Sequence, residues 1–211
     1  MVYYAQLYRI ASYYMKIISF IILSSLVFIL FSCGSNQTTN NYSSTIDNTP
    51  KIIIYPITYS TIYDGDNGDI IPNYCFGADS NNYIAAPFYS TSTVDLKNRL
   101  PTNKWSNPVY SRQGHKISSS WENLWDGNLD NMSLHDAEVI YEDDTSTSEI
   151  GYWTGTKSNG TYSGNNCNDW SSDTSTDNGT WGSFLSKDSQ WIDNSTASCS
   201  ATKYFLCFKY N

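Results

Sequence analysis

Hydrophobic positions along the chain form one long run near the N-terminus and several short clusters after residue 51. The long run extends from Ile17 to Phe31, directly after Lys16, and is followed by the small residue Ser32. This order is typical of a secretory signal, and it places the true start at Met15. A membrane-spanning helix usually needs ~20 apolar residues. We therefore favour a removable signal over the alternative, an uncleaved membrane helix.

Residues 34–50 form a polar segment with almost no apolar side chains (GSNQTTNNYSSTIDNTP). Such a segment cannot bury enough apolar surface to order itself. We expect it to act as a flexible tether with an r.m.s. reach of roughly 20–25 Å. The remaining residues, 51–211, are enough for one domain with a hydrophobic core and too few to expect two.

The short apolar clusters that follow predict a series of short strands and helices. Residues 51–55 (KIIIY) are a β-branched run that ends at Pro56, and we expect the first strand there. Residues 118–126 (SSSWENLWD) combine a Ser cap with an apolar face of i, i+3, i+4 spacing, and Gly127 follows as a helix terminator. The other expected elements are helices within 70–83 and 93–100, the latter with Asp95 near its start, strands at 137–141 and 203–210, and a hairpin-type turn at 157–160.

Composition narrows the fold class to α+β or mostly β, with long surface connections. Tyr, Trp and Phe make up 16% of the chain, which favours strands around an aromatic core. Only 15% of the residues are charged. Asn, Ser, Thr and Asp, which favour turns and loops, are instead abundant in the C-terminal half.

The chain is acidic, with 12 Lys and Arg against 20 Asp and Glu and a net charge of −8. Arg9 and Lys16 lie in the leader, which contains no acid, so its removal leaves 10 bases, 20 acids and a net charge of −10. A field of this sign repels a phosphate backbone, and no basic stripe is found in the sequence. Nucleic acids and heparin-like polyanions are therefore poor candidates for partners.

Three acidic clusters are candidates for metal binding or catalysis. Residues 64–69 (DGDNGD) place three carboxylates among glycines, but the spacing differs from that of an EF-hand loop and no downstream Glu completes it. Residues 142–144 (EDD) begin a polar loop. The only group that combines a His with carboxylates consists of Asp126, Asp130, His135 and Asp136. We favour solvated loops for all three, with calcium as the alternative for the first two and catalysis for the third. No metal, cofactor or catalytic residue is expected.

The five cysteines divide into one N-terminal residue and four in the expected domain. Residues 30–33 (LFSC) resemble the bacterial lipobox, in which the cysteine is lipidated and becomes the mature N-terminus. This resemblance makes Cys33 the lipidation site and implies an envelope protein attached to a membrane through this residue. The other four are an even number in an exported domain, which predicts two disulfides. They are Cys75, Cys167, Cys199 and Cys207, and the sequence alone selects none of their three connectivities.

The C-terminal half carries a pattern of aromatic, glycine and cysteine residues. It consists of Trp121-Glu122-x-Leu124 followed by Gly127, Trp153-x-Gly155, Cys167-x-x-Trp170, Ala197-Ser198-Cys199 and Leu206-Cys207. In order and spacing it resembles endostatin, the C-terminal domain of collagens XV and XVIII, and Cys75 fits the first cysteine of that domain. Bacterial lipoproteins with an endostatin-like domain of unknown function are similar. The resemblance covers about residues 52–210 and is strongest after Trp121.

The resemblance implies a C-type lectin-like fold, which is a twisted antiparallel sheet with two helices and long loops. It also implies two nested disulfides, Cys75 with Cys207 and Cys167 with Cys199. Endostatin's zinc-binding histidines and heparin-binding arginines have no counterparts here. The mature chain contains only His115, His135, Arg99 and Arg112 of these residue types. The calcium- and sugar-binding triplets of C-type lectins are missing too, so zinc, heparin and calcium-dependent sugar binding are not expected.

Together these features predict a lipid-anchored protein of the bacterial outer envelope, exposed at the cell surface, whose endostatin-like domain binds a host matrix protein or a glycan. The loops at 126–135 and 171–181 are the expected ligand surface. Trp153, Trp170 and Trp181 are the candidates for ligand stacking, although core packing is the favoured role of most of them. One alternative is a structural envelope lipoprotein without a soluble ligand. The other is an enzyme, because the enzyme that makes formylglycine shares the broad fold, but its chemistry needs a reactive cysteine and the domain cysteines here are assigned to disulfides.

Overall fold

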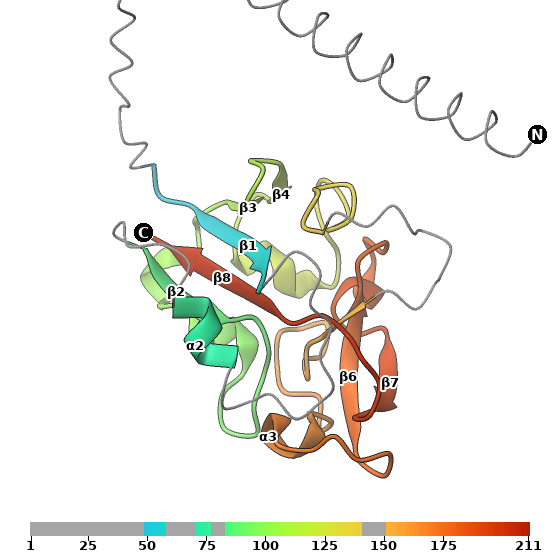
Figure 1. Cartoon of the computed structure of the whole chain (residues 1–211). Coiled ribbons are helices and arrows are strands. Elements are labelled where there is room, and N and C mark those ends of the chain that lie inside the picture. The colour runs from blue at the N-terminus through green and yellow to red at the C-terminus, as the bar shows by residue number, and fades with distance from the viewer. Residues whose placement is uncertain (1–48, 58–70, 77–82, 141–150) are drawn as a thin grey trace, which may run out of the picture. The chain divides into compact units, whose positions relative to one another are not determined.

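The computed structural model describes residues 49–57, 71–76, 83–140 and 151–211 (Figure 1). They form a mixed fold of helices and strands that is mostly sheet, with a few short helices and two disulfide bonds. The predicted signal and lipobox, residues 1–33, lie outside these ranges, as do the tether up to residue 48 and the acidic segments 64–69 and 142–144. Among the described helices, none has the length and apolar character needed to span a membrane.

The larger sheet contains five strands in the order β2-β8-β1-β3-β4. They are β1 (Ile52–Pro56), β2 (Ile84–Pro87), β3 (Val109–Ser111), β4 (Lys116–Ser118) and β8 (Leu206–Tyr210). The central strand β1 is parallel to β3 and antiparallel to β8. The strand predicted at 51–55 is confirmed with a shift of one residue, and the C-terminal strand is confirmed from Leu206 onward.

The smaller sheet contains β5 (Gly151–Trp153), β6 (Asn178–Ser183) and β7 (Ser195–Ser198), antiparallel in the order β5-β6-β7. It lies beside the larger sheet at the end where β8 begins (Figure 1). The backbone connects the two sheets, because Trp153 N–H donates to the carbonyl of Tyr204 over 2.9 Å. The segment before β8 therefore pairs with the small sheet before the chain enters the large one.

The helices are short. α2 covers Ile71–Phe76, within the predicted 70–83, and single 3-10 turns lie at Leu96–Arg99, Thr102–Lys104, Glu122–Asp126 and Ser189–Trp191. The helix predicted at 118–126 is confirmed only as one of these turns. It ends at Gly127, whose φ of 98° lies in the left-handed region that glycine adopts without strain.

The helix expected at 93–100 is reduced to the 3-10 turn Leu96–Arg99. Asp95 stands at its N-cap position, but the side chain does not cap the turn. Its carboxylate instead accepts the backbone N–H of Tyr162 over 2.8 Å. A contact with a residue 67 positions away has thus replaced the local hydrogen bond that the sequence pattern predicts.

The strand expected at 137–141 is wrong for its described residues, 137–140, which form a turn. Ala137 N–H donates to the carbonyl of Ser133 and Val139 N–H to that of Leu134, so their hydrogen bonds are local. The apolar side chains are nevertheless buried in the main core. The apolar residues at 137–140 are there because they are buried, and this gave the pattern of a strand although no strand in the described part of the chain pairs with them. By contrast, the hairpin-type turn at 157–160 is confirmed, with Gly160 N–H donating to the carbonyl of Lys157.

Aromatic side chains dominate two clusters of buried residues on opposite faces of the larger sheet. Ile52 and Ile54 of β1 belong to the first cluster, whose largest fully buried members are Trp121, Trp191, Tyr152 and Tyr204. Tyr55 of β1 belongs to the second cluster, which also holds Trp153, Trp170, Phe205 and all four described cysteines. The alternation of side chains along β1 therefore separates the two clusters.

The four cysteines form two nested disulfides, which is the pairing that the resemblance implies. Cys75 of α2 is bonded to Cys207 of β8, and Cys167 is bonded to Cys199, which follows β7. The sequence separations are 132 and 32 residues. The long bridge joins the two ends of the domain, and the short one pins a single turn to the smaller sheet.

Candidate functional site

The turn pinned by the short disulfide, α3 (Cys167–Trp170), has a left-handed backbone. Its four residues have φ values of 52°, 55°, 54° and 64°. Left-handed helical geometry costs L-residues roughly 1–2 kcal/mol each, and Asn and Asp tolerate it better than most residues. The two central residues are Asn168 and Asp169, so the sequence reduces the strain only in part. A turn of this kind persists because its surroundings hold it.

Tight packing and the disulfide hold both ends of this turn. Trp170 is fully buried, and its indole N–H donates to the carbonyl of Ser90 over 3.0 Å. Its ring lies 5.3 Å from the rings of both Tyr89 and Phe205, measured between centroids. At the other end, a Cβ at Gly179 would lie 2.8 Å from the Cys167 sulfur, so only glycine lets β6 pass this close to the disulfide.

The Asp169 carboxylate ties the exposed side of the turn to a distant loop. It accepts the backbone N–H of Ser92 over 2.6 Å, the Ser92 hydroxyl over 2.5 Å and the side-chain amide of Asn166 over 2.5 Å. Burial by itself would raise the pKa of Asp169, but the hydrogen bonds from Ser92 and Asn166 outweigh it and leave the pKa below its ordinary value. The carboxylate is therefore ionised at neutral pH.

A polar cavity of about 390 Å³ opens beside this turn. The side chains that line it include Ser92, Tyr162, Asn166, Asp169, Asp177 and Asn178. Among its described lining residues there is no Lys, Arg or His. The cavity therefore offers carboxylates, amides and hydroxyls, which are groups that hydrogen-bond a neutral polar ligand.

Tyr162 is the aromatic residue of this cavity. It is half-buried, and its hydroxyl donates to the Asn166 side-chain carbonyl over 3.3 Å. Burial raises the pKa of the Tyr162 phenol, and the negative charge of Asp169 raises it further. The phenol therefore stays neutral and can both donate and accept hydrogen bonds.

The wall across from Tyr162 is formed by the loop that leads into β6. Asp177 accepts hydrogen bonds from the hydroxyls of Ser172 over 2.5 Å and of Thr174 over 3.2 Å. Thr176 of the same loop and Asn178, the first residue of β6, are exposed at the cavity. This loop belongs to the predicted ligand surface at 171–181. That predicted surface therefore includes residues that line the polar cavity beside α3.

The three tryptophans predicted as candidates for ligand stacking lie in the core. Trp153 and Trp170 are 0% exposed and Trp181 is 8% exposed. Trp153 and Trp170 pack against each other with centroids 6.0 Å apart, and the ammonium of Lys203 lies 3.8 Å from the centroid of the Trp181 ring. None of them offers a free ring face, so ligand stacking by these residues is corrected to core packing.

The second predicted ligand loop, 126–135, is a network of local polar contacts. Asp130 accepts hydrogen bonds from the hydroxyls of Ser118 and Ser119 and from the Ser119 backbone. The Ser119 hydrogen bonds lower the pKa of the Asp130 carboxyl, and burial opposes them only in part. Asp126 accepts the backbone N–H of Asn128 over 2.9 Å. These contacts fasten the loop to the end of β4 and stabilise its own turn at Asp126.

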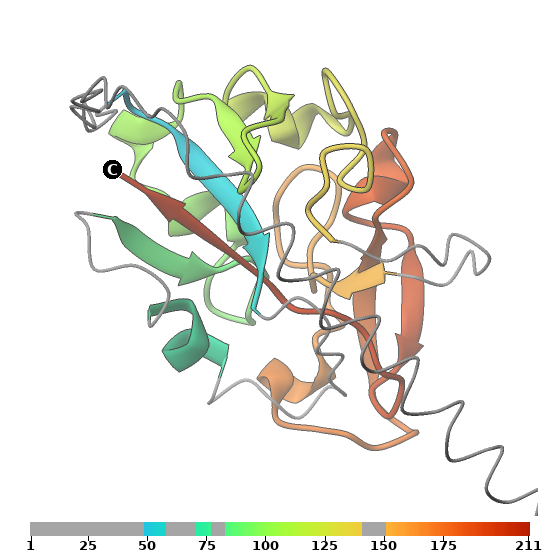
Figure 2. The same ribbon diagram turned by 45° about the horizontal axis from the view of Figure 1, so that its top comes forward.

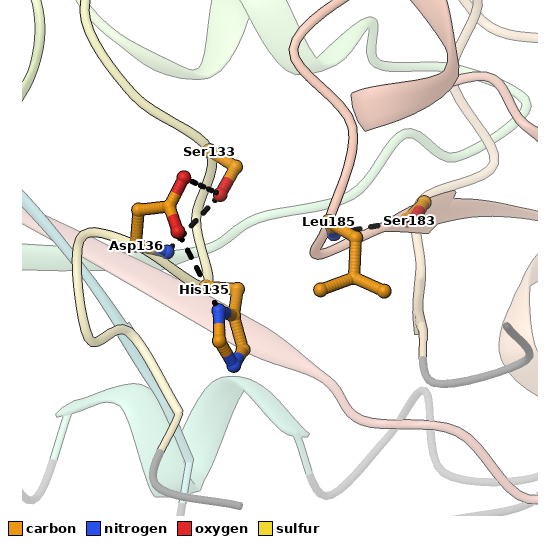
Figure 3. A network of polar contacts seen from close by, with 5 residues as sticks. All are labelled: Ser133, His135, Asp136, Ser183 and Leu185. Carbon is orange, nitrogen blue, oxygen red and sulfur yellow. Dashed lines mark hydrogen bonds and ion pairs between the residues drawn. The ribbon is translucent and has the colours of Figure 1, made fainter. Parts of the chain in front are cut away.

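The only His in that loop pairs with its neighbour (Figure 3). His135 Nδ1 lies 3.7 Å from an Asp136 carboxylate oxygen, and the other oxygen of Asp136 accepts the Ser133 hydroxyl over 2.8 Å. Beside this pair, Leu185 N–H donates to the Ser183 hydroxyl over 3.3 Å (Figure 3). Within the described residues no three potential metal ligands gather. The four residues singled out from the sequence are therefore not brought together as one site.

The residues that build the cavity were missed at the level of sequence. Ser92 and Asp169 are 77 positions apart and meet only in the folded domain. Tyr162 stands in a Gly-, Ser- and Asn-rich segment, and an isolated aromatic residue in such a segment is the signal that could have marked it. Comparison of the chain with protein-family models and with curated protein sequences finds no match.

Proposed function

We propose that this domain is a binding module for a glycan and that a lipid on Cys33 holds it at the bacterial envelope. The observation that carries the proposal is the polar cavity at the left-handed turn. The resemblance to endostatin and to the C-type lectin-like fold supports it, because the nested disulfides and the short helices agree with that fold. The lipobox-like sequence before Cys33 supports a location at the cell surface, where such a module would meet host glycans.

The chemistry of the cavity favours a ligand rich in hydroxyl groups. Each sugar hydroxyl both donates and accepts, and the cavity presents acceptors on Asp177 together with amide and hydroxyl groups on Asn178 and Thr176. The neutral hydroxyl of Tyr162 adds a further group that can both donate and accept. A protein ligand would need an apolar contact surface in addition, which this cavity lacks.

The rigidity of the cavity also supports a binding role. Its floor is the left-handed turn, which is fixed by the disulfide, by the burial of Trp170 and by the hydrogen bonds of Asp169. Groups that are already held in place lose little conformational entropy when a ligand binds. A strained turn with so many supports is expected where a surface has to keep one geometry.

The test is a glycan array probed with the full chain carrying both disulfides. We expect saturable binding to at least one class of glycan. Replacing Tyr162→Ala or Asn178→Ala should weaken it by roughly 5- to 30-fold, because a polar contact typically contributes on the order of 1–2 kcal/mol. Tyr74→Ala is the matched control, since Tyr74 is 50% exposed on α2, away from the cavity.

Thermal unfolding of the same variants separates binding from stability. Tyr162→Ala should keep its midpoint close to that of Tyr74→Ala while its binding falls. Folded protein that binds no glycan on the array would contradict the proposal and leave a protein ligand or a purely structural envelope role. Equal weakening by Tyr74→Ala would show that the glycan binds elsewhere on the domain.

A further inference from the structure

One face of the larger sheet carries basic side chains that are dispersed in the sequence. Alternation along β1 places Ile53 and Tyr55 on the face opposite Ile52 and Ile54. Ile53 pairs with Lys209 of β8 on one side and with Tyr110 of β3 on the other, and Tyr110 pairs with Lys116 of β4. Lysines on β4 and β8 therefore flank an apolar centre on this face.

Two further bases complete the group. Lys51 directly precedes β1 and is two residues before Ile53, so the alternation of the strand places both on the same face. Arg112 directly follows β3, and its guanidinium lies 5.2 Å from the centroid of the Tyr55 ring. We call Lys51, Arg112 and Lys116, with Ile53 and Tyr110 between them, the basic face. Lys209 borders this face but is only 8% exposed, with its ammonium 5.0 Å from the centroid of the Tyr83 ring. The charged side chains on the five strands of this sheet are all basic, since none of these strands contains an Asp or Glu.

A cavity of about 330 Å³ opens on the basic face. Lys51 and Arg112 contribute to its lining, together with Ile53 and Tyr110. Cations beside an aromatic and an aliphatic side chain suit an amphipathic anion, whose charged group meets the bases while its apolar part meets the ring and the isoleucine.

The position of this cavity relates it to the N-terminal segment of the chain. Thr49, the first described residue and the last but one of the predicted tether, lines it. Both views place the start of β1 and the β3–β4 turn at one end of the domain and α3 at the other (Figures 1 and 2). The basic face thus lies at the end of the domain where the described chain begins, and the polar cavity lies at the other end.

We propose that the basic face docks on the anionic phospholipid headgroups of the membrane that holds the lipid anchor. This inference rests on the anchor in the proposed function and adds the orientation of the domain, with the polar cavity directed away from the bilayer. The tether expected at residues 34–50 would have a reach of roughly 20–25 Å, which would keep the domain within contact distance of the headgroups. The net negative charge does not prevent this contact, because charges beyond a Debye length of about 8 Å are largely screened at physiological salt.

The experiment uses the mature lipidated chain in vesicles of phosphatidylcholine alone or with roughly a third of phosphatidylglycerol. Hydrogen exchange is followed in the β3–β4 turn, residues 111–116, and in the cavity loop, residues 166–178. Each basic side chain near an anionic surface favours contact by about fivefold. We expect exchange in the turn to slow by at least about fivefold on anionic vesicles only, and exchange in the cavity loop to stay unchanged.

Matched variants test the assignment to these side chains. Lys51→Gln with Arg112→Gln should remove the slowing, whereas Lys157→Gln, an exposed lysine of the 157–160 turn, should preserve it. Equal slowing by soluble glycerol phosphate at the same phosphate concentration would overturn docking on a membrane in favour of a small-anion site. Equal exchange on both vesicle types would overturn the inference altogether.

The same vesicles separate this inference from the proposed function. If the chain binds stably to neither type of vesicle, the proposed lipid anchor is wrong. Both the envelope location in the proposed function and the docking inference then fail. If the chain is anchored but the turn exchanges at the same rate on both, only the docking is wrong. Glycan binding by the anchored Lys51→Gln, Arg112→Gln variant should equal that of the unmodified chain, because the polar cavity contains neither residue.

Discussion

The hydrogen bonds of Asp169 give the most direct test of how the left-handed turn is held. The substitution Asp169→Asn preserves the size of the side chain but removes its charge and one acceptor oxygen. Three donors now converge on the carboxylate, two from Ser92 and one from Asn166. The new side-chain NH₂ group would face at least one of these donors, so at least one hydrogen bond is lost and the others lose their charge assistance.

The size of the effect follows from these contacts. A hydrogen bond to a charged group contributes roughly 1.5–3 kcal/mol, and solvent exposure of Asp169 places the expected loss at the lower end, about 2 kcal/mol in the free energy of unfolding. For a domain of this size each kcal/mol lowers the melting temperature by roughly 2–4 °C. We therefore expect a fall of about 4–8 °C in calorimetry at pH 7. Asp173→Asn is the control, because Asp173 is exposed on the same loop.

The pH dependence of this difference is a second readout. The folded-state pKa of Asp169 is lowered, while an unfolded aspartate titrates at about 3.9. The extra stability is thus complete above about pH 5 and is lost as the pH falls through the folded-state pKa. The gap between the wild type and Asp169→Asn should be constant from pH 5 to 7 and shrink below about pH 4. Equal melting of Asp169→Asn and Asp173→Asn, or a gap that does not change in acid, would refute the account.

Two further substitutions address the backbone and the disulfides. Replacing Asn168 by Gly should leave the domain more stable than replacing it by Ala, by about 1 kcal/mol in urea unfolding, because Ala in left-handed geometry carries the full strain; equal midpoints would contradict the left-handed turn. Removing the Cys75–Cys207 bridge should cost about 5 kcal/mol and removing Cys167–Cys199 about 4 kcal/mol, from loops of 132 and 32 residues. While the domain is still folded, removing Cys167–Cys199 should weaken glycan binding and removing Cys75–Cys207 should not. The opposite result would show that the Cys167–Cys199 bridge does not hold the cavity.

Local patterns predicted the elements whose stabilising contacts are local. The β-branched run before Pro56 became β1, and Gly127 ended a turn with a positive φ. These features depend on neighbouring residues and on the burial of one face, both of which the sequence displays. The pairing of the cysteines came from the resemblance, since spacing alone leaves three connectivities open.

Long-range contacts account for what the sequence did not predict. Asp95 has the position of a helix cap but hydrogen-bonds Tyr162, so the helix shortened to a single turn. Trp153, Trp170 and Trp181 share their sequence context with exposed polar loops, yet packing between distant segments buries them. Sequence patterns record the preferences of a segment, whereas the partners that override them are set by the closed domain.

The same logic links the stability of this domain to its proposed binding site. The left-handed turn is unfavourable by itself, and its supports come from Ser90 and Ser92 in one loop and from Cys199 after β7. These partners reach the turn only when both sheets are in place, so the cavity cannot form in a partly folded chain. The binding surface is thus a product of domain closure, and the disulfide that closes it also fixes its geometry. A protein exposed outside the cell would benefit from this coupling, because a damaged domain would lose its ligand instead of binding with an altered site.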